Sequence, residues 1–214
     1  NKCLLHVGNK PLLRHAVDML KVNGVDDIFV LVGYHADKVK AELGDGVTYI
    51  HNENYATTSI LGSLVLAKDH LENSSFVFMT GDSLIHPELF SKFLNEEGEL
   101  LASVELKQCD EEDYKVLLDN HKIVTMSKKL PLDKAHGEFT GMTRFSKEAS
   151  NKFFHSTKKH LGSNSGKAYL ADMLLHLQDN GFDLKPVYTN GVPRIEIDFP
   201  HDLEKAQNIY SEHF

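Results

Sequence analysis

An aspartate stands just after a short apolar run, at a place where α/β proteins commonly bind ligands. Phe76 to Met79 carry no strongly polar side chain, and Thr80-Gly81-Asp82-Ser83 follows directly. Such a run, bounded by turn formers, is typical of a strand buried on both faces in a helix-covered parallel sheet. Asp82 then lies past the carboxyl end of a central strand, where open α/β sheets bind ligands. A carboxylate facing nucleotide phosphates there suits Mg²⁺, although aspartate also serves as a turn former.

Polar side chains also share a face in two later segments. In Arg194-Ile195-Glu196-Ile197-Asp198, strand alternation places the arginine and both acidic residues on one side. Asp198 also precedes Pro200 by two residues, where a helix-start carboxylate is common. Tyr169 and Asp172 are three residues apart on a predicted helix and could offer a ring and a negative charge to a cationic amine. Because the chain has no tryptophan, a primary amine is favoured over a quaternary ammonium.

The order of the elements predicts a Rossmann-like, doubly wound α/β fold with a mostly parallel sheet. Apolar residues recur at helical spacing from Leu13 to Leu20 after Pro11, and Gly24 closes this helix. Strands are predicted at 27–33, 47–50 and 76–79, and helices at 37–43, 60–71 and 87–94. This alternation favours parallel strands joined by helices.

The pattern changes near residue 100. We predict an antiparallel and helical insertion over about 100–180 inside one domain that spans 1–214. Its strands are predicted at 100–107, 114–118, 122–127 and 138–145, its helices at 147–160 and 167–177, and its most flexible linker at 162–166. Strands at 183–188 and 193–198 and a helix at 200–210 complete the chain.

The composition disfavours some function classes. The chain has 214 residues and a formal net charge of -8, and it lacks a lysine and arginine cluster, so a nucleic-acid partner is disfavoured. An acidic protein that handles anionic substrates then needs metal ions and a few placed cations. Cys3 and Cys109 lie outside any metal-ligand spacing and suit a reducing compartment. We expect a cytoplasmic protein without a membrane span.

Five segments in order resemble the nucleotidyltransferase superfamily that makes nucleotide sugars, and most of all its small-acceptor branch, the phosphocholine and 2-aminoethylphosphonate cytidylyltransferases. The segments are NKCLLHVGNKPLLRHAVDMLKVNGVDDIFVLVGYH, NENYATTSILGSL, FMTGDS, GEFTGMTRFS and RIEIDFPHDLEKA. The resemblance implies the nucleotide-diphospho-sugar transferase fold. It also implies a strand and a glycine-rich loop, roughly AAGxGxR, before the segment matched by Asn1 to Cys3, and the printed sequence contains neither.

The resemblance implies roles for residues of a nucleotide site. Lys2 reaches the phosphates, and Asp82 and Asp198 converge on Mg²⁺, with Glu196 as a partner or alternative ligand. The residues implied to contact the nucleotide are Lys2, Asn52, Tyr55, Thr58, Ser59, Ser63, Gly81 and Asp82. Thr58 or Ser59 is equally suited to cap the following helix.

The resemblance also implies an acceptor site. Lys115 and Lys128 offer cations to a phosphate or phosphonate, although on pattern alone they are solvated lysines at a strand edge. The remaining residues assigned to the acceptor are Glu138, Thr140, Gly141, Tyr169, Asp172 and Glu196.

The activity implied is a Mg²⁺-dependent cytidylyltransferase. It joins CTP to a small phosphorylated or phosphonate amino alcohol and releases pyrophosphate. Positioning and charge screening suffice for this reaction, so no protein nucleophile is needed. Two alternatives stay open: a sugar-1-phosphate nucleotidyltransferase that uses UTP, GTP or dTTP, and a catalytically silent nucleotide-binding relative. The sequence leaves open the acceptor, a homodimer and fusion to further domains.

Overall fold

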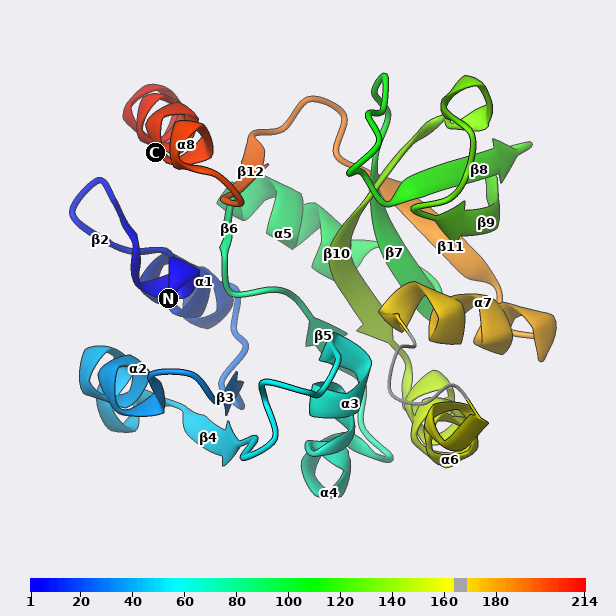
Figure 1. The fold of residues 1–214 in the computed structure, drawn as a ribbon, viewed down its shortest axis with the longest axis horizontal. Helices are drawn as coiled ribbons and strands as arrows, with labels where there is room; N and C mark the ends of the chain where they lie inside the picture. Colours follow the sequence, from blue (N-terminus) through cyan, green and yellow to red (C-terminus); the bar gives the residue numbers. More distant parts are fainter. Residues whose placement is uncertain (164–168) are drawn as a thin grey trace. The chain divides into compact units, whose positions relative to one another are not determined.

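Contacts between residues divide the chain into two units, each built from segments that are distant in the sequence. The computed structural model describes residues 1–163 and 169–214, with side chains described for 1–157 and 169–214. The first unit contains Asn1–Ala56, Thr80–Asn95 and Val192–Phe214, and the second contains Thr57–Met79 and Glu96–Gly191. Most of their helices and strands are labelled in Figure 1. A single domain over 1–214 stays a prediction.

The first unit has short strands and four longer helices among its described elements. In chain order these elements are η1 (Lys2–Leu4), β1 (His6–Val7), β2 (Lys10–Pro11), α1 (Leu12–Val22), β3 (Phe29–Val32), α2 (Ala36–Leu43), η2 (Gly44–Gly46), β4 (Thr48–His51), β6 (Ser83–Ile85), α5 (Pro87–Asn95), β12 (Arg194–Glu196) and α8 (Pro200–His213).

The predicted strand, helix and strand between residues 27 and 50 are confirmed. Strands β3 and β4 pair in parallel, with Val30 opposite Tyr49, and α2 connects them. The apolar face of α1 packs with this pair, because Val17 belongs to the same buried cluster as Val30 and Val39. Gly24 has a φ of 75°, which fits its role after the end of α1.

Strand β6 was not predicted, and it changes where Asp82 lies. The apolar run forms β5 (Phe76–Phe78), and β6 begins directly after Asp82. Strand β6 pairs with β12 in antiparallel register, with Ser83 opposite Glu196. Asp82 therefore lies at the amino end of a second short strand, rather than at the end of the strand that the apolar run forms.

Helix α8 packs against the start of the chain inside the first unit. The Gln207 side chain accepts a hydrogen bond from Gly8 N and donates one to His6 O, at 2.9 and 3.0 Å. Ala206 of α8 is buried in one cluster with Val7 and Ile197. The two chain ends are thus held together in one small core.

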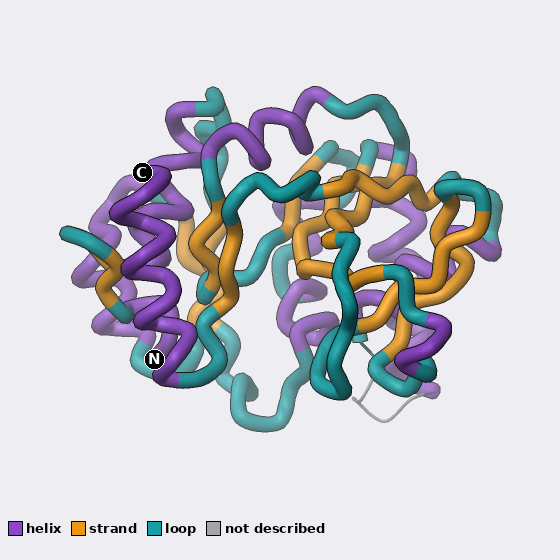
Figure 2. Tube along the Cα trace, turned by 90° about the horizontal axis from the view of Figure 1, so that it is seen from above, coloured by secondary structure: helices purple, strands orange, loops and turns teal. Residues whose placement is uncertain are grey.

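The second unit is organised around a mixed sheet. Its elements are α3 (Ile60–Val65), α4 (Lys68–Leu71), β5, β7 (Leu100–Glu105), β8 (Lys115–Asp119), β9 (Lys122–Ser127), η3 (Leu132–Lys134), β10 (Gly137–Phe145), α6 (Lys147–Ser163), α7 (Leu170–Asp179) and β11 (Leu184–Tyr188). The strand order is β11-β7-β10-β8-β9, with β5 also paired to β10. The helices and strands can be followed in Figure 2.

The predicted antiparallel insertion is present in this sheet. Strand β10 pairs antiparallel with β7 and β8, and β8 pairs antiparallel with β9, whereas β11 pairs in parallel with β7. Strand β5 differs from the expectation because it pairs antiparallel with β10. Its hydrophobic run matched the parallel pattern, but an apolar run does not fix the direction of a partner.

Two helix predictions need correction. The helix expected over 60–71 is two short helices, α3 and α4, and α6 continues through Gly162 and Ser163, where a linker was expected. The rest of that linker and the predicted start of the next helix at Lys167 lie outside the described residues. The predicted apolar face of α7 is confirmed, because Leu170, Met173, Leu174 and Leu177 are buried. Among the described helices, none has the length and apolarity to cross a lipid bilayer.

Candidate active site

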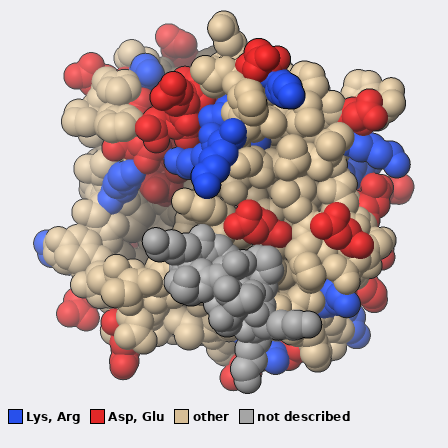
Figure 3. Space-filling model, turned by 45° about the vertical axis from the view of Figure 1, so that its right-hand side comes forward, with Lys and Arg blue, Asp and Glu red and all other residues tan. Residues whose placement is uncertain are grey.

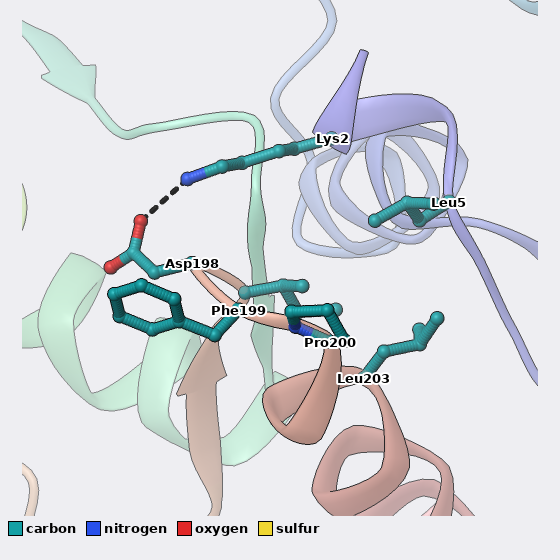
Figure 4. A pocket seen from close by; sticks show the side chains of 7 residues that line it. Lys2, Leu5, Asp198, Phe199, Pro200 and Leu203 are labelled. Carbon is teal, nitrogen blue, oxygen red and sulfur yellow. Dashed lines mark hydrogen bonds and ion pairs between the residues drawn. The ribbon is translucent and has the colours of Figure 1, made fainter.

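Lys2 and Asp198, near opposite ends of the chain, meet within the first unit. Lys2 lies at the start of η1, and Asp198 lies between β12 and α8. The Lys2 Nζ atom is 2.5 Å from Asp198 Oδ1, and the two side chains are 46% and 53% exposed. Figure 4 shows the lysine extending from η1 toward this carboxylate. The pair is therefore formed at the surface, within reach of a ligand from solvent.

The backbone around Asp198 is fixed from two sides. Ile197 N donates to Asp82 O at 3.0 Å, which continues the β6–β12 pairing by one step. On the other side the Asp202 carboxylate accepts hydrogen bonds from Asp198 N at 3.2 Å and Phe199 N at 2.9 Å. Desolvation raises the pKa of Asp202, but these hydrogen bonds outweigh it and the pKa lies below its usual range. Asp202 thus stays charged and caps α8.

Asp82 has an oxygen that the protein does not satisfy. Its Oδ1 atom is buried and has no hydrogen-bond partner among the described residues. Burying a carboxylate oxygen without a partner is costly, so such an atom marks a place where a ligand or ion fits. Gly81 gives the turn its close packing, since a Cβ there would lie 3.3 Å from Leu13 Cδ1.

The charges of this cluster act on Lys2 together. The hydrogen bond to Asp198 raises the pKa of the Lys2 ammonium, and the charges of Asp198, Asp82 and Glu196 raise it further, against a smaller lowering by burial. Glu196 has a cation nearby as well, because Arg194 Nη2 lies 3.5 Å from its Oε2. Asp82, Asp198 and Glu196 therefore all act electrostatically on Lys2. The roles of these four residues toward a metal or a nucleotide stay predictions.

The cluster has the donors that a magnesium ion uses. Among the described residues, no group of three or more His, Cys, Asp and Glu side chains could hold a metal. Mg²⁺ needs only one or two carboxylates when waters and substrate phosphates supply the remaining oxygens. The unsatisfied Asp82 Oδ1 and the half-exposed Asp198 carboxylate fit this requirement.

A pocket of about 260 Å³ opens beside the ion pair in the first unit. Its lining, drawn in Figure 4, includes the predicted residues Lys2 and Asp198. The apolar remainder was not predicted from the sequence: Leu5, Ile197, Phe199, Pro200 and Leu203. Pro200 was the available sequence signal for this part of the pocket, because a proline often stands at the first position of a helix and so places the start of α8 next to Asp198.

The predicted nucleotide residues divide between the two units. Asn52 and Tyr55 belong to the first. Asn52 is 5% exposed, and its Oδ1 accepts a hydrogen bond from Asn54 N at 2.9 Å. Tyr55 is 45% exposed. Its side chain lies against Gly33, where a Cβ would be 2.4 Å from Tyr55 Cβ, and its ring centroid is 6.1 Å from that of Tyr34. An open aromatic face there is compatible with base stacking.

Thr58, Ser59 and Ser63 belong to the second unit, at the start of α3. Ser59 is the N-cap: its Oγ accepts from Gly62 N at 3.2 Å, and Ser63 Oγ donates to Ser59 O at 3.1 Å. Of the two capping candidates, the structure selects Ser59 rather than Thr58. The role of all three residues toward a nucleotide stays a prediction.

Lys115 differs from the pattern-based interpretation of a solvated lysine. It is 2% exposed, and its ammonium donates to the carbonyl oxygens of Asp110, Glu111 and Asp113 at 3.1 to 3.3 Å. The pattern indicated a solvated lysine at a strand edge, but the loop before β8 supplies three carbonyl partners to the side chain. Lys128 is half exposed and lies 3.8 Å from Glu112.

Glu138 belongs to a charged network that the sequence did not reveal. Lys107 Nζ lies 3.0 Å from Asp113 Oδ1 and 3.1 Å from Glu138 Oε2. Burial lowers the pKa of Lys107, but these two carboxylates together outweigh it and the pKa is raised. Figure 3 shows basic and acidic side chains side by side on one face of the molecule. Spacing gave no signal, because the partners come from β10 and from the loop between β7 and β8.

The other predicted acceptor residues have structural contacts of their own. Thr140 is buried and hydrogen-bonds Ser103, and Gly141 has a φ of 85° where the β10–β7 register shifts. Asp172 accepts a hydrogen bond from Tyr169 N at 2.9 Å, at the start of α7. The Tyr169 ring is exposed, and its centroid is 5.7 Å from that of Tyr114. Tyr114 was not predicted, and burial, Asp172 and Tyr169 raise its pKa.

Comparisons with known proteins identify the family of the chain. A sequence profile described as the MobA-like NTP transferase domain matches residues 1–128, which is more than half of the chain. The chain belongs to this family. It is 30% identical to choline-phosphate cytidylyltransferase of Streptococcus pneumoniae over 125 residues, 57% of this chain and 52% of that protein. The alignment thus spans about half the length of that relative.

Two further likenesses cover nearly the whole chain. CTP:phosphoglutamine cytidylyltransferase of Campylobacter jejuni is 23% identical over 227 residues, 95% of this chain and 89% of its own length. The solved structure of the inositol-1-phosphate CTP transferase from T. maritima superposes with a TM-score of 0.79 at 24% identity, covering 99% of this chain and 86% of its own. This likeness confirms the predicted α/β fold of the nucleotide-diphospho-sugar transferase type.

Proposed function

We propose that the protein is a Mg²⁺-dependent cytidylyltransferase that acts on a small phosphorylated or phosphonate amino alcohol. The observation that carries this proposal is the cluster of Lys2, Asp82 and Asp198 in a chain of the NTP transferase family. A nucleotide triphosphate needs a divalent cation and a placed lysine, and an acidic protein must supply both locally. The half-exposed carboxylate and the unsatisfied buried oxygen are suited to that cation.

CTP is the proposed nucleotide because the two sequence relatives described above are named as cytidylyltransferases. Their names also specify small phosphorylated acceptors, choline phosphate in one and phosphoglutamine in the other. A nitrogen-containing phosphorylated acceptor of similar size is the substrate class that these names support for this chain. The exposed Tyr169 ring beside Tyr114 is compatible with an amine, since aromatic faces attract cations.

In the proposed reaction an anionic oxygen of the acceptor attacks the α-phosphorus of CTP in line. The bond between the α-phosphorus and its bridging oxygen breaks, and pyrophosphate leaves with that oxygen. Asp82 and Asp198 would hold Mg²⁺, which supplies charge neutralisation between the two anions. Lys2 would neutralise phosphate oxygens, as a compact ammonium does well. The protein's own task is then to position the two anions and to hold these charges in place.

Pyrophosphate release tests the proposal directly. The full-length protein is incubated with Mg²⁺ and each of CTP, UTP, GTP and dTTP, in combination with phosphocholine, phosphoethanolamine, phosphoglutamine, 2-aminoethylphosphonate and a sugar 1-phosphate. We expect release with CTP and a nitrogen-containing acceptor, and its loss when EDTA is added. Release only with a sugar phosphate and another nucleotide would replace the proposal by the sugar-nucleotide alternative. No release from any pair would favour a catalytically silent relative.

A further inference from the structure

Lys2 is placed to compete with a metal ion for Asp198. Its ammonium nitrogen lies 2.5 Å from Asp198 Oδ1. Under the proposed function, on which this inference rests, that same carboxylate holds Mg²⁺. A carboxylate oxygen in such close contact with an ammonium group has a lower affinity for a metal cation, because the ammonium and the cation repel each other at short range.

We propose that Lys2 is the resident counterion of Asp198, and that Lys2 and the divalent cation occupy this carboxylate in turn. When the cation arrives, the ammonium leaves Asp198 and becomes available to the phosphates of the nucleotide. When the cation leaves with the products, Lys2 returns to Asp198. The carboxylate thus always has a cationic partner.

The contacts of Asp198 hold it in place, so Lys2 is the partner of the ion pair that moves. The backbone of Asp198 is held by the Asp202 carboxylate, and the next residue back, Ile197, is tied to Asp82 O. Helix α8 and the β6–β12 pair therefore fix the position of the aspartate. The Lys2 side chain reaches Asp198 from η1, a single turn of three residues. Lysine has four rotatable side-chain bonds, so its ammonium can change partners while Asp198 stays in place.

Lys2, rather than the neighbouring Arg194, is suited to be the counterion of Asp198. The Arg194 side chain is 7% exposed and its guanidinium lies 3.5 Å from Glu196, so it is already engaged next to the cluster. Asp82 adds a second carboxylate whose charge also acts on Lys2. Its buried Oδ1 has no hydrogen-bond partner among the described residues, which leaves it able to receive a cation. One carboxylate is thus occupied by lysine while the other is ready for metal.

The exposure of the pair makes an exchange feasible. An ion pair whose two side chains are about half exposed is weak, because water solvates both charges when they separate. Lys2 also borders the pocket of about 260 Å³ lined by Leu5, Phe199 and Leu203, so its stem has open space beside it (Figure 4). A buried, enclosed pair would resist the same displacement.

Metal binding without nucleotide tests the exchange. Mn²⁺, which also prefers oxygen ligands, is titrated into the protein and free Mn²⁺ is measured by electron paramagnetic resonance. We expect Lys2→Met to bind Mn²⁺ about threefold to tenfold more tightly than wild type, because Asp198 no longer has a competing cation. Lys2→Arg keeps a positively charged partner for Asp198, and its Mn²⁺ affinity is expected to stay close to that of wild type.

Lys10→Met is the matched control. Lys10 pairs with Asp18 at 2.5 Å in the same unit and at similar exposure, so the variant removes one positive charge and one ion pair elsewhere. Its Mn²⁺ affinity is expected to equal that of wild type. A similar gain in Lys10→Met and Lys2→Met would assign the effect to net charge and overturn the inference. Thermal unfolding of each variant verifies that it is folded.

The outcomes separate this inference from the proposed function. If Lys2→Met binds Mn²⁺ no more tightly than wild type, the counterion role is wrong, and pyrophosphate release can still establish the transferase. If neither protein binds Mn²⁺ in the absence of nucleotide, the exchange is overturned, and pyrophosphate release with and without EDTA then decides the proposed function separately. Tighter binding by Lys2→Met together with loss of binding by Asp198→Asn is the result that supports the exchange.

Discussion

Lys2, Asp82 and Asp198 in the first unit keep bonding capacity for a ligand, whereas Lys107, Asp113 and Lys115 in the second have theirs filled by protein groups. Asp82 has a buried oxygen without a partner among the described residues, and the Lys2–Asp198 pair is about half exposed. In the second unit, by contrast, Lys107 has two carboxylate partners and Lys115 has three carbonyl partners.

The difference separates charged groups that remain accessible to a ligand from charged groups whose hydrogen bonds stabilise the fold. A fully partnered network stabilises the loop that contains it, and a substitution there leaves buried groups unpaired. A partly satisfied cluster costs stability unless something else binds to it.

The largest expected effect comes from Asp82→Asn. We expect turnover to fall by about 100-fold or more, since a group that stabilises charge in the transition state is weakened. The melting temperature should stay close to wild type because the protein itself does not use Oδ1. Pyrophosphate release and thermal unfolding measure both quantities, and wild-type turnover would contradict the role of this carboxylate.

Asp113→Asn is the opposite case in the second unit. Asp113 is 10% exposed at its side chain, pairs with Lys107, and accepts a hydrogen bond from Asp110 N. The variant should lower the free energy of unfolding by about 1–3 kcal/mol while the rate per folded molecule stays near wild type. A large loss of rate without loss of stability would mean that the two clusters do not differ in the way described.

Lys115→Met tests whether this lysine is mainly structural. The variant leaves three carbonyl oxygens without the buried ammonium, and we expect a loss of about 2–4 kcal/mol in the free energy of unfolding. Lys128→Met is the control, because Lys128 is half exposed and its ion pair is long; its effect should stay within about 0.5 kcal/mol. Equal losses, measured by urea denaturation, would remove the distinction between them.

His15 provides a smaller, pH-dependent test inside the first unit. It is buried, and its Nε2 lies 2.8 Å from Val7 O. Burial lowers the pKa of His15 below its ordinary value of 6.5, against the hydrogen bond to Val7, while nearby Lys10 lowers and Asp18 raises the pKa. The unfolded chain then binds the proton more tightly than the folded protein does.

The direction of the pH dependence follows from this difference in proton affinity between the unfolded and the folded chain. The contribution of neutral His15 to the free energy of unfolding is fully present above pH 6.5 and is lost as the pH falls below that value. His15→Gln retains a donor for Val7 O but does not titrate, so the loss of stability between pH 7.5 and pH 5 should be smaller than in wild type. His51→Gln, at an exposed position, should keep the full dependence. An unchanged dependence in His15→Gln would contradict this account.

The smallest expected effect belongs to Ser59→Ala. Loss of the N-cap hydrogen bond to Gly62 N should cost about 1 kcal/mol of stability. Ser74→Ala, at an exposed position, is the control. If Ser59→Ala instead leaves stability unchanged and weakens CTP binding, its hydroxyl serves the nucleotide more than the helix.

Periodicity and turn residues predicted most of the fold. The helix α1, the pair β3–β4 and the apolar face of α7 follow from spacing, glycine and proline alone. Strand β6 was missed because three residues carry almost no periodic signal. The antiparallel partner of β5 was missed because it is β10, and the apolar run of β5 does not encode a distant partner.

The candidate site was predicted less evenly. Asp82 and Asp198 follow from strand ends and from the family resemblance, and the structure brings both to Lys2. The burial of Lys115 and the Lys107–Glu138 pair depend on loops that fold back over a sheet, and residue spacing contains no information on such contacts. Asp202 was likewise missed, although its place three residues after Phe199 is typical of helix capping.

The cap on α8 makes the position of the Asp198 carboxylate, the proposed metal ligand, depend on the first turn of this helix. Asp202 holds the amide of Asp198 only while the first turn of α8 is formed. Local opening of that turn needs much less energy than global unfolding, and it would release Asp198 while the rest of the core stays intact. Amide hydrogen exchange at Asp198 and Phe199 therefore reports the fraction of molecules in which this carboxylate is in place.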